Sequence, residues 1–451
     1  MLLKIILGIL GLGIVVFIHE LGHFTAAKIF KVKVLSFSIG WGPVLLRKKI
    51  GTTEYRLSAI PLGGYCGMEG ETAYQKALEE NLPEIPLEEG SLYSVNPMKR
   101  ILIAVAGPLF NLLFAAIALV IYSSIPYTYY TTPAQVILAS EYDSQYENFP
   151  AETSGLKTGD IIKKIDGKNV SNFDEITKFI SINPGKELKL EIERNGQAME
   201  LTLIPKLNPE TGTGEIGVYP YIKPVIRDVG HDSKAMKSGL KTGDKIIEIN
   251  GIPVENTLQI NKIIGNPDID SLKIKYLTAG NSEKDTTINF DSSGERKIGI
   301  TWEYIAVTEK SQGFFDSIYK GIKGTIQMTA LTIKSFGLLF KGIDITKAVS
   351  GPLRITYMLG EVTSAGFSAG ISQGILVLMN FLAIINISLF IMNLLPIPVL
   401  DGGLVLLSLI ELISRKRIKP KFMYYFQTVG AVIILMLIIF AFWMDISFFV
   451  K

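Results

Sequence analysis

Apolar residues in this chain are gathered into long uncharged runs, whereas a soluble protein spreads them at helix or strand spacing. A helix needs about 20 apolar residues to cross a bilayer. Four runs reach that length: about Leu2–Ala26, Ile101–Pro126, one within Val362–Leu400, and Phe422–Met444. No small-residue cleavage site follows the first run, which favours a retained helix over a signal peptide. The pattern therefore predicts four membrane-spanning helices.

Basic residues indicate the orientation of these helices. Three lysines lie within Lys28–Lys33, after the first run, and Lys99 and Arg100 precede the second. A basic cluster, Arg415–Lys421, joins the third run to the fourth. Positive charge collects on the cytoplasmic side, and four spans place both connections on one side. We therefore expect both termini and the long segment after Pro126 to lie outside the cytoplasm.

The segment 314–345 is apolar but contains several charges, among them Lys334 and Lys341. This pattern favours an amphipathic helix on the outer membrane surface over a fifth span. A fifth span would also place the two basic connections on opposite sides of the membrane.

An internal repeat lies between the second and third runs. Its copies read SGLKTGDIIKKIDGKNV (Ser154–Val170) and SGLKTGDKIIEINGIPV (Ser238–Val254), at an offset of 84 residues. Each copy has Gly-Leu entering a turn, Gly-Asp opening a strand of alternating isoleucines, and a second turn at Asp166-Gly167 or Asn250-Gly251. A helical pattern follows each, at Asp174–Ile182 and Thr257–Ile264. The repeat predicts two copies of an α+β module.

Composition agrees with a chain that is part membrane and part soluble. Of 451 residues, 48% are hydrophobic and 19% are charged. The net charge of +3 gives no reason to expect nucleic acid as a partner. The single cysteine, Cys66, excludes an intramolecular disulfide.

Two of the three histidines lie in the sequence HELGH, near the end of the first run. His19 and His23 are four residues apart, so on a helix both side chains can reach one metal ion. Zinc with two imidazoles, a carboxylate and a water is the usual catalytic set. Glu20 lies beside it and can accept a proton from that water. Ionisable groups inside a span mark function, and we predict a zinc-dependent hydrolase.

The third ligand is predicted to be Asp401. The remaining histidine, His231, falls in the soluble segment, across the membrane from HELGH. Asp401 ends the third run in NLLPIPVLDGG (Asn393–Gly403). Its prolines interrupt the helix, and its glycines allow close backbone approach. The set predicts one Zn²⁺ per chain.

HELGH in the first span, the repeated module and NLLPIPVLDGG together resemble the site-2 protease family of intramembrane zinc metalloproteases. The resemblance covers the whole chain and is closest to the Gram-negative envelope-stress branch. The repeated module resembles the bacterial permuted PDZ domain. Further matching motifs are FSIGWGP (Phe37–Pro43), IPLGGYCGMEGE (Ile60–Glu71), NPMKR (Asn96–Arg100) and GPLFN (Gly107–Asn111).

The resemblance implies a fold of four spanning helices, a cytoplasmic-side membrane-associated β-sheet and two tandem extracytoplasmic PDZ-like α+β domains. The expected segments are 1–30 (first span), 31–95 (β region), 96–126 (second span), 127–222 and 223–306 (PDZ-like domains), 307–361 (interfacial helices), 362–412 (third span) and 413–451 (fourth span).

The resemblance also implies roles for individual residues. His19, His23 and Asp401 become the zinc ligands and Glu20 the general base. Asn393, Pro396 and Pro398 are expected to shape the substrate cleft. The chain has Leu404 where the family often has histidine, and Ser388 where it tends to have asparagine, with Asn386 nearby. Whether Ser388 or Asn386 holds the substrate backbone stays open.

The implied function is regulated intramembrane proteolysis in envelope stress, in the inner membrane of a bacterium. Implied substrates are single-span membrane proteins already shortened by another protease, such as an anti-sigma factor, and remnant signal peptides. The active site would face the cytoplasmic side, and the PDZ-like domains the periplasm.

Two questions and one alternative function stay open. The PDZ-like domains either exclude uncut substrates by size, which analogy favours, or bind a peptide by strand addition, or act as spacers. The region from Val32 to Tyr65 either holds an unwound substrate or shields the site from water, and these roles are compatible. The alternative is a non-proteolytic membrane scaffold, for which a broken metal set would be expected.

Overall fold

The computed structural model describes residues 2–209, 211–290, 296–338 and 351–450. The chain forms two compact units. Residues 1–127 and 310–451 make the first, a helical unit, and residues 128–309 make the second.

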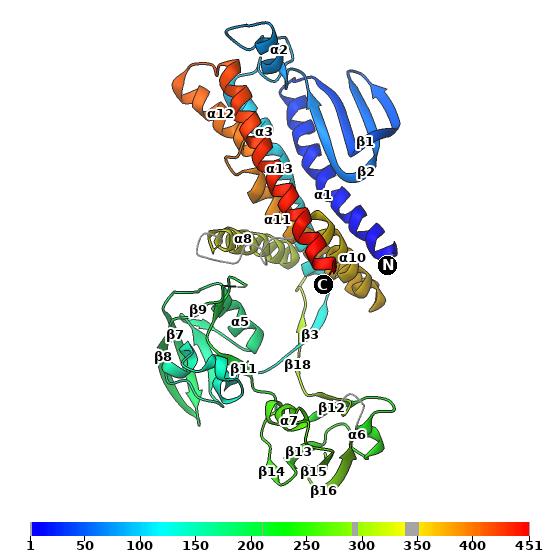
Figure 1. Cartoon of the computed structure of the whole chain (residues 1–451), viewed down its shortest axis with the longest axis vertical. Helices are drawn as coiled ribbons and strands as arrows, with labels where there is room; N and C mark the ends of the chain where they lie inside the picture. Colours follow the sequence, from blue (N-terminus) through cyan, green and yellow to red (C-terminus); the bar gives the residue numbers. More distant parts are fainter. Residues whose placement is uncertain (1, 210, 291–295, 339–350, 451) are drawn as a thin grey trace. The chain divides into compact units, whose positions relative to one another are not determined.

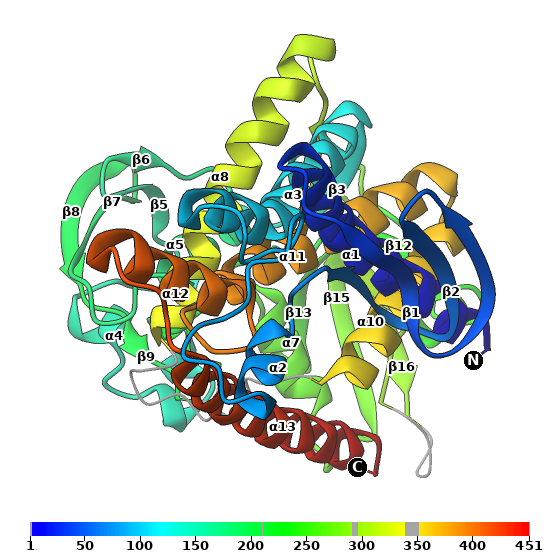
Figure 2. The same ribbon diagram turned by 90° about the horizontal axis from the view of Figure 1, so that it is seen from above.

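Four described helices are long and apolar enough to cross a membrane, as the hydrophobic runs predicted. They are α1 (Leu2–Ile29), α3 (Pro97–Ser124), α11 (Ile371–Asn393) and α13 (Pro420–Val450). α13 packs against α10 and α2 at the outside of the helical unit (Figure 2). Most of its apolar surface is not covered by other parts of the described chain.

The third hydrophobic run contains more than one helix. α10 (Pro352–Ser368) ends before Gly370, which has φ 132°, a conformation that glycine adopts readily. α11 follows, and α12 (Asp401–Ser414) begins after the two prolines. The boundary expected between residues 361 and 362 therefore falls inside α10, because the break is made by glycine rather than by a change in hydropathy.

α8 (Phe314–Leu338) covers part of the segment expected at the membrane surface and is not among the four candidate spans. It crosses α3 closely, since a Cβ atom on Gly321 would lie 2.6 Å from the backbone nitrogen of Val120. The remainder of that segment, 339–345, lies outside the described residues.

The sheet predicted for residues 32–65 forms beside α1 from two long strands (Figures 1 and 2). They are β1 (Val34–Ile50) and β2 (Thr53–Met68), with α2 (Ala73–Glu79) after them. Ser36 pairs with both Glu54 and Gly67, so each strand bends and contributes two segments to the sheet. Segment 64–68 pairs only with 34–39 among the described residues, and it forms the edge of the sheet next to α1.

The second unit contains two modules with the same strand order, as the repeat predicted. In the first, the order is β6-β5-β7-β8, and in the second it is β14-β13-β15-β16. A helix follows the second strand of each: α5 (Phe173–Ser181) and α7 (Thr257–Ile264). The other strands of these sheets are β5 (Ile161–Ile165), β6 (Lys168–Asn169), β7 (Leu188–Arg194), β8 (Gln197–Leu203), β13 (Lys245–Ile249), β14 (Ile252–Pro253), β15 (Ser271–Leu277) and β16 (Glu283–Asn289).

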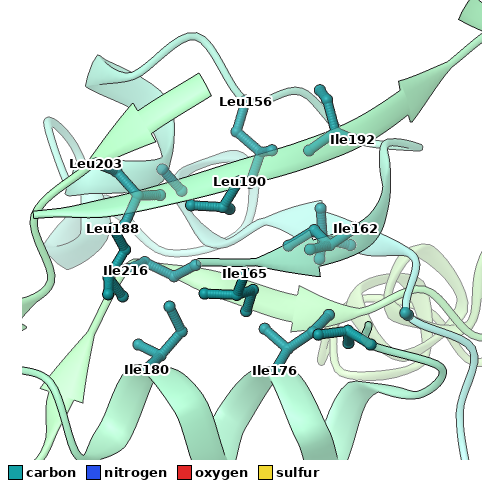
Figure 3. Packing of buried hydrophobic residues seen from close by; sticks show 14 residues of the cluster. Leu156, Ile162, Ile165, Ile176, Ile180, Leu188, Leu190, Ile192, Leu203 and Ile216 are labelled. Carbon is teal, nitrogen blue, oxygen red and sulfur yellow. The ribbon is translucent and has the colours of Figure 1, made fainter. Parts of the chain in front are cut away.

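Each module has a hydrophobic core of its own (Figure 3 shows the first). Leu156 and Ile162 are buried in the first core, and Leu240 and Ile246 take the same positions 84 residues later. The two modules therefore share the packing of their cores as well as the sequence of their turns. Short elements complete the unit: β3 (Tyr127–Thr131), β4 (Val136–Leu138), α4 (Pro150–Thr153), β9 (Lys206–Leu207), β10 (Gly214–Glu215), β11 (Val218–Pro220), β12 (Ile226–Val229), α6 (Lys234–Lys237), β17 (Ile300–Trp302) and β18 (Ile305–Glu309).

Two buried carboxylates connect helices of the first unit. Asp445 of α13 is fully buried and accepts hydrogen bonds from the backbone N–H groups of Gly351 (2.8 Å) and Leu353 (2.9 Å), which start α10. These are donors that a helix start leaves without intrahelical partners, and the negative charge suits the positive helix end.

The second carboxylate is Glu411 of α12, which forms a buried ion pair with Arg100 of α3. Glu411 also accepts from the backbone N–H of Ile418 at 2.8 Å, and the Arg100 guanidinium lies 5.4 Å from the centre of the Tyr93 ring. This ion pair joins the start of α3 to the end of α12.

The buried ion pair gives a prediction about stability. Arg100→Met leaves Glu411 charged and unpaired, so we expect the free energy of unfolding to fall by about 3–5 kcal/mol. The double variant with Glu411→Met should recover most of that loss. Unfolding of the detergent-solubilised protein by denaturant titration measures both. Arg47→Met is the control, because its contact with Glu54 is exposed; equal losses in the two single variants would contradict the prediction.

Candidate metal centre

Three side chains from two distant parts of the sequence meet in the first unit. α1 places His19 and His23 one turn apart, and Asp401 is the first residue of α12. The two Nε2 atoms are 3.2 Å apart. Asp401 Oδ2 lies 3.2 Å from His19 Nε2, and Oδ1 lies 3.3 Å from His23 Nε2. The structure therefore brings together the three ligands that the sequence predicted.

These distances fit a zinc ion. Nitrogen and oxygen ligands lie about 2.1 Å from zinc, so two ligands at the tetrahedral angle are roughly 3.4 Å apart. The three contacts among the side chains are close to that value. Three protein ligands leave the fourth position of a tetrahedral site for water or substrate.

Close contact between α1 and α3 positions the histidines. A Cβ atom on Gly107 would lie 2.2 Å from His23 Nε2, and a Cβ on Gly22 would lie 2.3 Å from the carbonyl oxygen of Ala106. Small residues of this kind let two helices approach backbone to backbone. Any larger residue at Gly107 would clash with the His23 imidazole and displace it.

The loop between α11 and α12 positions Asp401. Cβ atoms on Gly402 and Gly403 would lie 2.1 and 2.5 Å from the carbonyl oxygens of Leu395 and Ile397, so the loop folds back tightly onto the start of α12. Val399 in this loop has φ 76°, which is rare for a β-branched residue and costs energy. The surrounding packing therefore holds the loop in one conformation.

A cavity of about 660 Å³ lies beside the three ligands. Glu20 faces it, and the backbone N–H of Cys66 in β2 lies near the Glu20 carboxylate. Burial raises the pKa of the Cys66 thiol to about 12, so this cysteine stays neutral and is a poor nucleophile. The lining residues include His19, Glu20, His23, Trp41, Tyr65, Cys66, Gly67, Ile103, Asn393, Val399, Leu400, Asp401 and Leu404.

The residues expected to bind substrate have different positions. Asn393 lines the cavity. Pro396 and Pro398 lie in the loop, where Pro398 packs on the backbone of Gly430 in α13 instead of lining the cavity.

Asn386 and Ser388 are not among the cavity-lining residues. Asn386 is fully buried, and its amide donates to the carbonyl of Leu382 in the same helix. Ser388 is exposed and donates to the carbonyl of Ile384. Both side chains thus hydrogen-bond to the preceding turn of α11, and the expectation that one of them reaches the cavity is not supported.

α3 adds two contacts that the sequence analysis did not predict. His23 Nδ1 lies 2.9 Å from the carbonyl oxygen of Ile103, and His19 Nδ1 lies 3.2 Å from Nδ2 of Asn111. In the sequence, the only sign of these contacts is Asn111 itself, a single asparagine within an apolar run. His231, by contrast, is exposed in the second unit beside Asp232.

The contact between Gly107 and His23 gives a prediction about metal binding. Gly107→Ala should displace the His23 ring, and we expect zinc content after purification to fall well below one per chain. Elemental analysis of the detergent-purified protein measures it. Gly324→Ala on α8 is the control, since its Cβ would make an ordinary 3.6 Å contact with Leu119. Full zinc content in Gly107→Ala would contradict the prediction.

Comparison with known proteins agrees with this centre. Residues 7–437 match the model of Peptidase family M50. A relative from Treponema pallidum, named "Putative zinc metalloprotease", is 42% identical over 99% of both chains. The "Regulator of sigma E protease" of Haemophilus influenzae is 29% identical over 97% of both chains.

Among solved structures, the PDZ domain of an SdrC-like protein from Listeria monocytogenes matches 20% of this chain and 90% of its own, with 23% identity and a TM-score of 0.17. The family model covers nearly the whole chain, and the protease relatives match it from end to end. This chain therefore belongs to peptidase family M50, the site-2 proteases, and is a zinc metalloprotease similar to RseP.

Proposed function

We propose that this protein hydrolyses peptide bonds within the membrane-spanning segments of single-span membrane proteins. The observation that carries the proposal is the meeting of His19, His23 and Asp401 among helices that are apolar enough to cross a bilayer. A protease for soluble substrates would be expected to have its metal ligands in the soluble unit instead.

The chain's own residues account for the proton transfers. Zinc in this set supplies Lewis acidity at the scissile carbonyl and makes water acidic enough to attack near neutral pH. Glu20 takes a proton from the attacking water as its oxygen bonds to the carbonyl carbon. When the C–N bond breaks, Glu20 passes that proton to the leaving nitrogen. The Cys66 N–H holds the Glu20 carboxylate beside the cavity meanwhile.

The edge of the sheet is the proposed holder of the substrate. A peptide bond in a helix is shielded by its own hydrogen bonds, so the segment must be unwound before it is cut. Tyr65, Cys66 and Gly67 line the cavity on segment 64–68, the edge next to α1. An extended substrate can add to such an edge as a further strand. Asn393 lines the same cavity and is proposed to bind the substrate backbone, and the sheet is also proposed to shield the site from water.

The substrates we propose are anti-sigma factors already shortened by another protease, and remnant signal peptides, in the inner membrane of a bacterium. The name of the Haemophilus influenzae relative supports a role in envelope-stress signalling. The basic residues near the ends of α1, α3 and α12 support a cytoplasmic-side active site. The two repeated modules would then lie in the periplasm as PDZ-like domains that exclude uncut substrates.

One observation favours a peptide-binding role for the first module. A groove of about 300 Å³ lies between α5 and the strands β10 and β11, lined by Phe173, Ile176, Ile180 and Ile216 among others. A groove between a helix and a strand is where PDZ domains take up an extended peptide. Size exclusion and binding of a shortened substrate end are compatible in one module.

Replacing the proposed general base tests the proposed chemistry. We expect Glu20→Gln to keep one zinc per chain and to lose about 10²–10⁴-fold in cleavage rate, because the amide cannot take the proton. Purified protein is assayed on a single-span substrate with and without its extracytoplasmic domain, with zinc measured in parallel. Wild-type cleavage by Glu20→Gln would contradict the mechanism, and absence of zinc or cleavage in the wild type would contradict the function.

The edge strand gives a second prediction. Cys66→Pro removes the N–H that contacts Glu20, while an edge strand tolerates proline on its unpaired side. We expect cleavage to slow about 10–100-fold, the size of a lost hydrogen bond to a charged group, with zinc retained. Cys66→Ala, which keeps the backbone N–H, should cleave like the wild type. Equal rates for the two variants would show that this N–H has no role.

A further inference from the structure

One helix, α3, contacts the Nδ1 atoms of both histidines. The carbonyl oxygen of Ile103 lies 2.9 Å from His23 Nδ1, and the Asn111 side chain lies 3.2 Å from His19 Nδ1. Both residues belong to α3 and are separated by about two helical turns. Each imidazole therefore has Nδ1 toward α3 and Nε2 toward Asp401.

The buried position of Asn111 has a cost in free energy. Its side chain is completely buried in a helix apolar enough to span a membrane. Its Oδ1 has no hydrogen-bond partner among the described residues, and a buried polar atom without a partner costs about 1–3 kcal/mol. An aliphatic residue at this position would avoid this cost. We therefore look for the role of the amide in its contact with His19.

The position of the proton on a metal-bound histidine determines whether its partner must be a hydrogen-bond donor or an acceptor. An imidazole that binds a metal through Nε2 carries its proton on Nδ1 and donates it to an acceptor, which fixes the ring and makes Nε2 a better ligand. For His23 the acceptor is the Ile103 carbonyl. For His19 the acceptor has to be Asn111. The oxygen and the nitrogen of its amide group have nearly the same shape, so the two can exchange places. A half-turn about the Cβ–Cγ bond brings the unpartnered Oδ1 to face Nδ1.

We propose that Asn111 is a positioning residue for the metal centre. Its Oδ1 accepts the Nδ1 proton of His19 and holds Nε2 toward the position shared with His23 and Asp401. This inference rests on the ligand set of the proposed function. It assigns no contact with substrate to Asn111, and it predicts an effect on metal affinity that precedes any effect on cleavage.

The test measures zinc affinity in the full-length protein in detergent, by competition with a chelating dye. Asn111→Leu keeps the branched outline of the side chain and removes the acceptor, and we expect zinc affinity to fall about 10–100-fold. Asn111→Asp keeps an acceptor oxygen, and we expect affinity within a few-fold of the wild type. Thr363→Val is the control, because it removes another buried, unpartnered polar group, from α10.

The outcomes separate this inference from the proposed function. Wild-type affinity in Asn111→Leu, or an equal loss in the leucine and aspartate variants, would overturn the positioning role even though the protein binds zinc. A wild-type protein that binds no zinc would overturn the ligand set itself. If Asn111→Leu does not yield a monodisperse protein, Asn111→Ala makes the same comparison.

Discussion

Placing ionisable side chains among apolar helices is costly unless they satisfy one another, and this constraint shapes the helical unit. His19, His23 and Asp401 meet their requirement mutually, within 3.3 Å. The outward nitrogens of the imidazoles then need partners of their own, which α3 supplies through a backbone carbonyl and an amide. The predicted metal ligands are therefore part of a continuous polar network, as buried ionisable groups require.

Close packing follows from this network. Gly107 brings α3 against His23, Gly402 and Gly403 let the loop turn back over the start of α12, and Gly430 accepts Pro398. The ion pair of Arg100 with Glu411 joins the same two helices, near the start of α3 and near the end of α12. α3 and α12 are thus joined both by close packing at the predicted metal centre and by a buried ion pair.

Much of this arrangement was predictable from the sequence, for reasons that particular residues make plain. The histidines of HELGH have helical spacing, and the hydrophobic runs are long enough to cross a bilayer. The 84-residue repeat marks two modules. Each of these features can be recognised within one stretch of the sequence or by comparing two stretches. Asn386 and Ser388 show the limit: a polar residue in an apolar helix can bond to the preceding turn or face a cavity, and periodicity does not distinguish these. The break at Gly370 and the contact of Asn111 with His19 likewise depend on packing between distant segments.

The ligands come from nearly opposite ends of the chain, with the histidines in α1 and the aspartate at the start of α12. During synthesis, a chain that has inserted its first helices carries two ligands and the general base but lacks the third. The complete set forms only after the soluble modules and α11 have been made. The order of the sequence thus leaves the predicted metal site incomplete until most of the chain has been made.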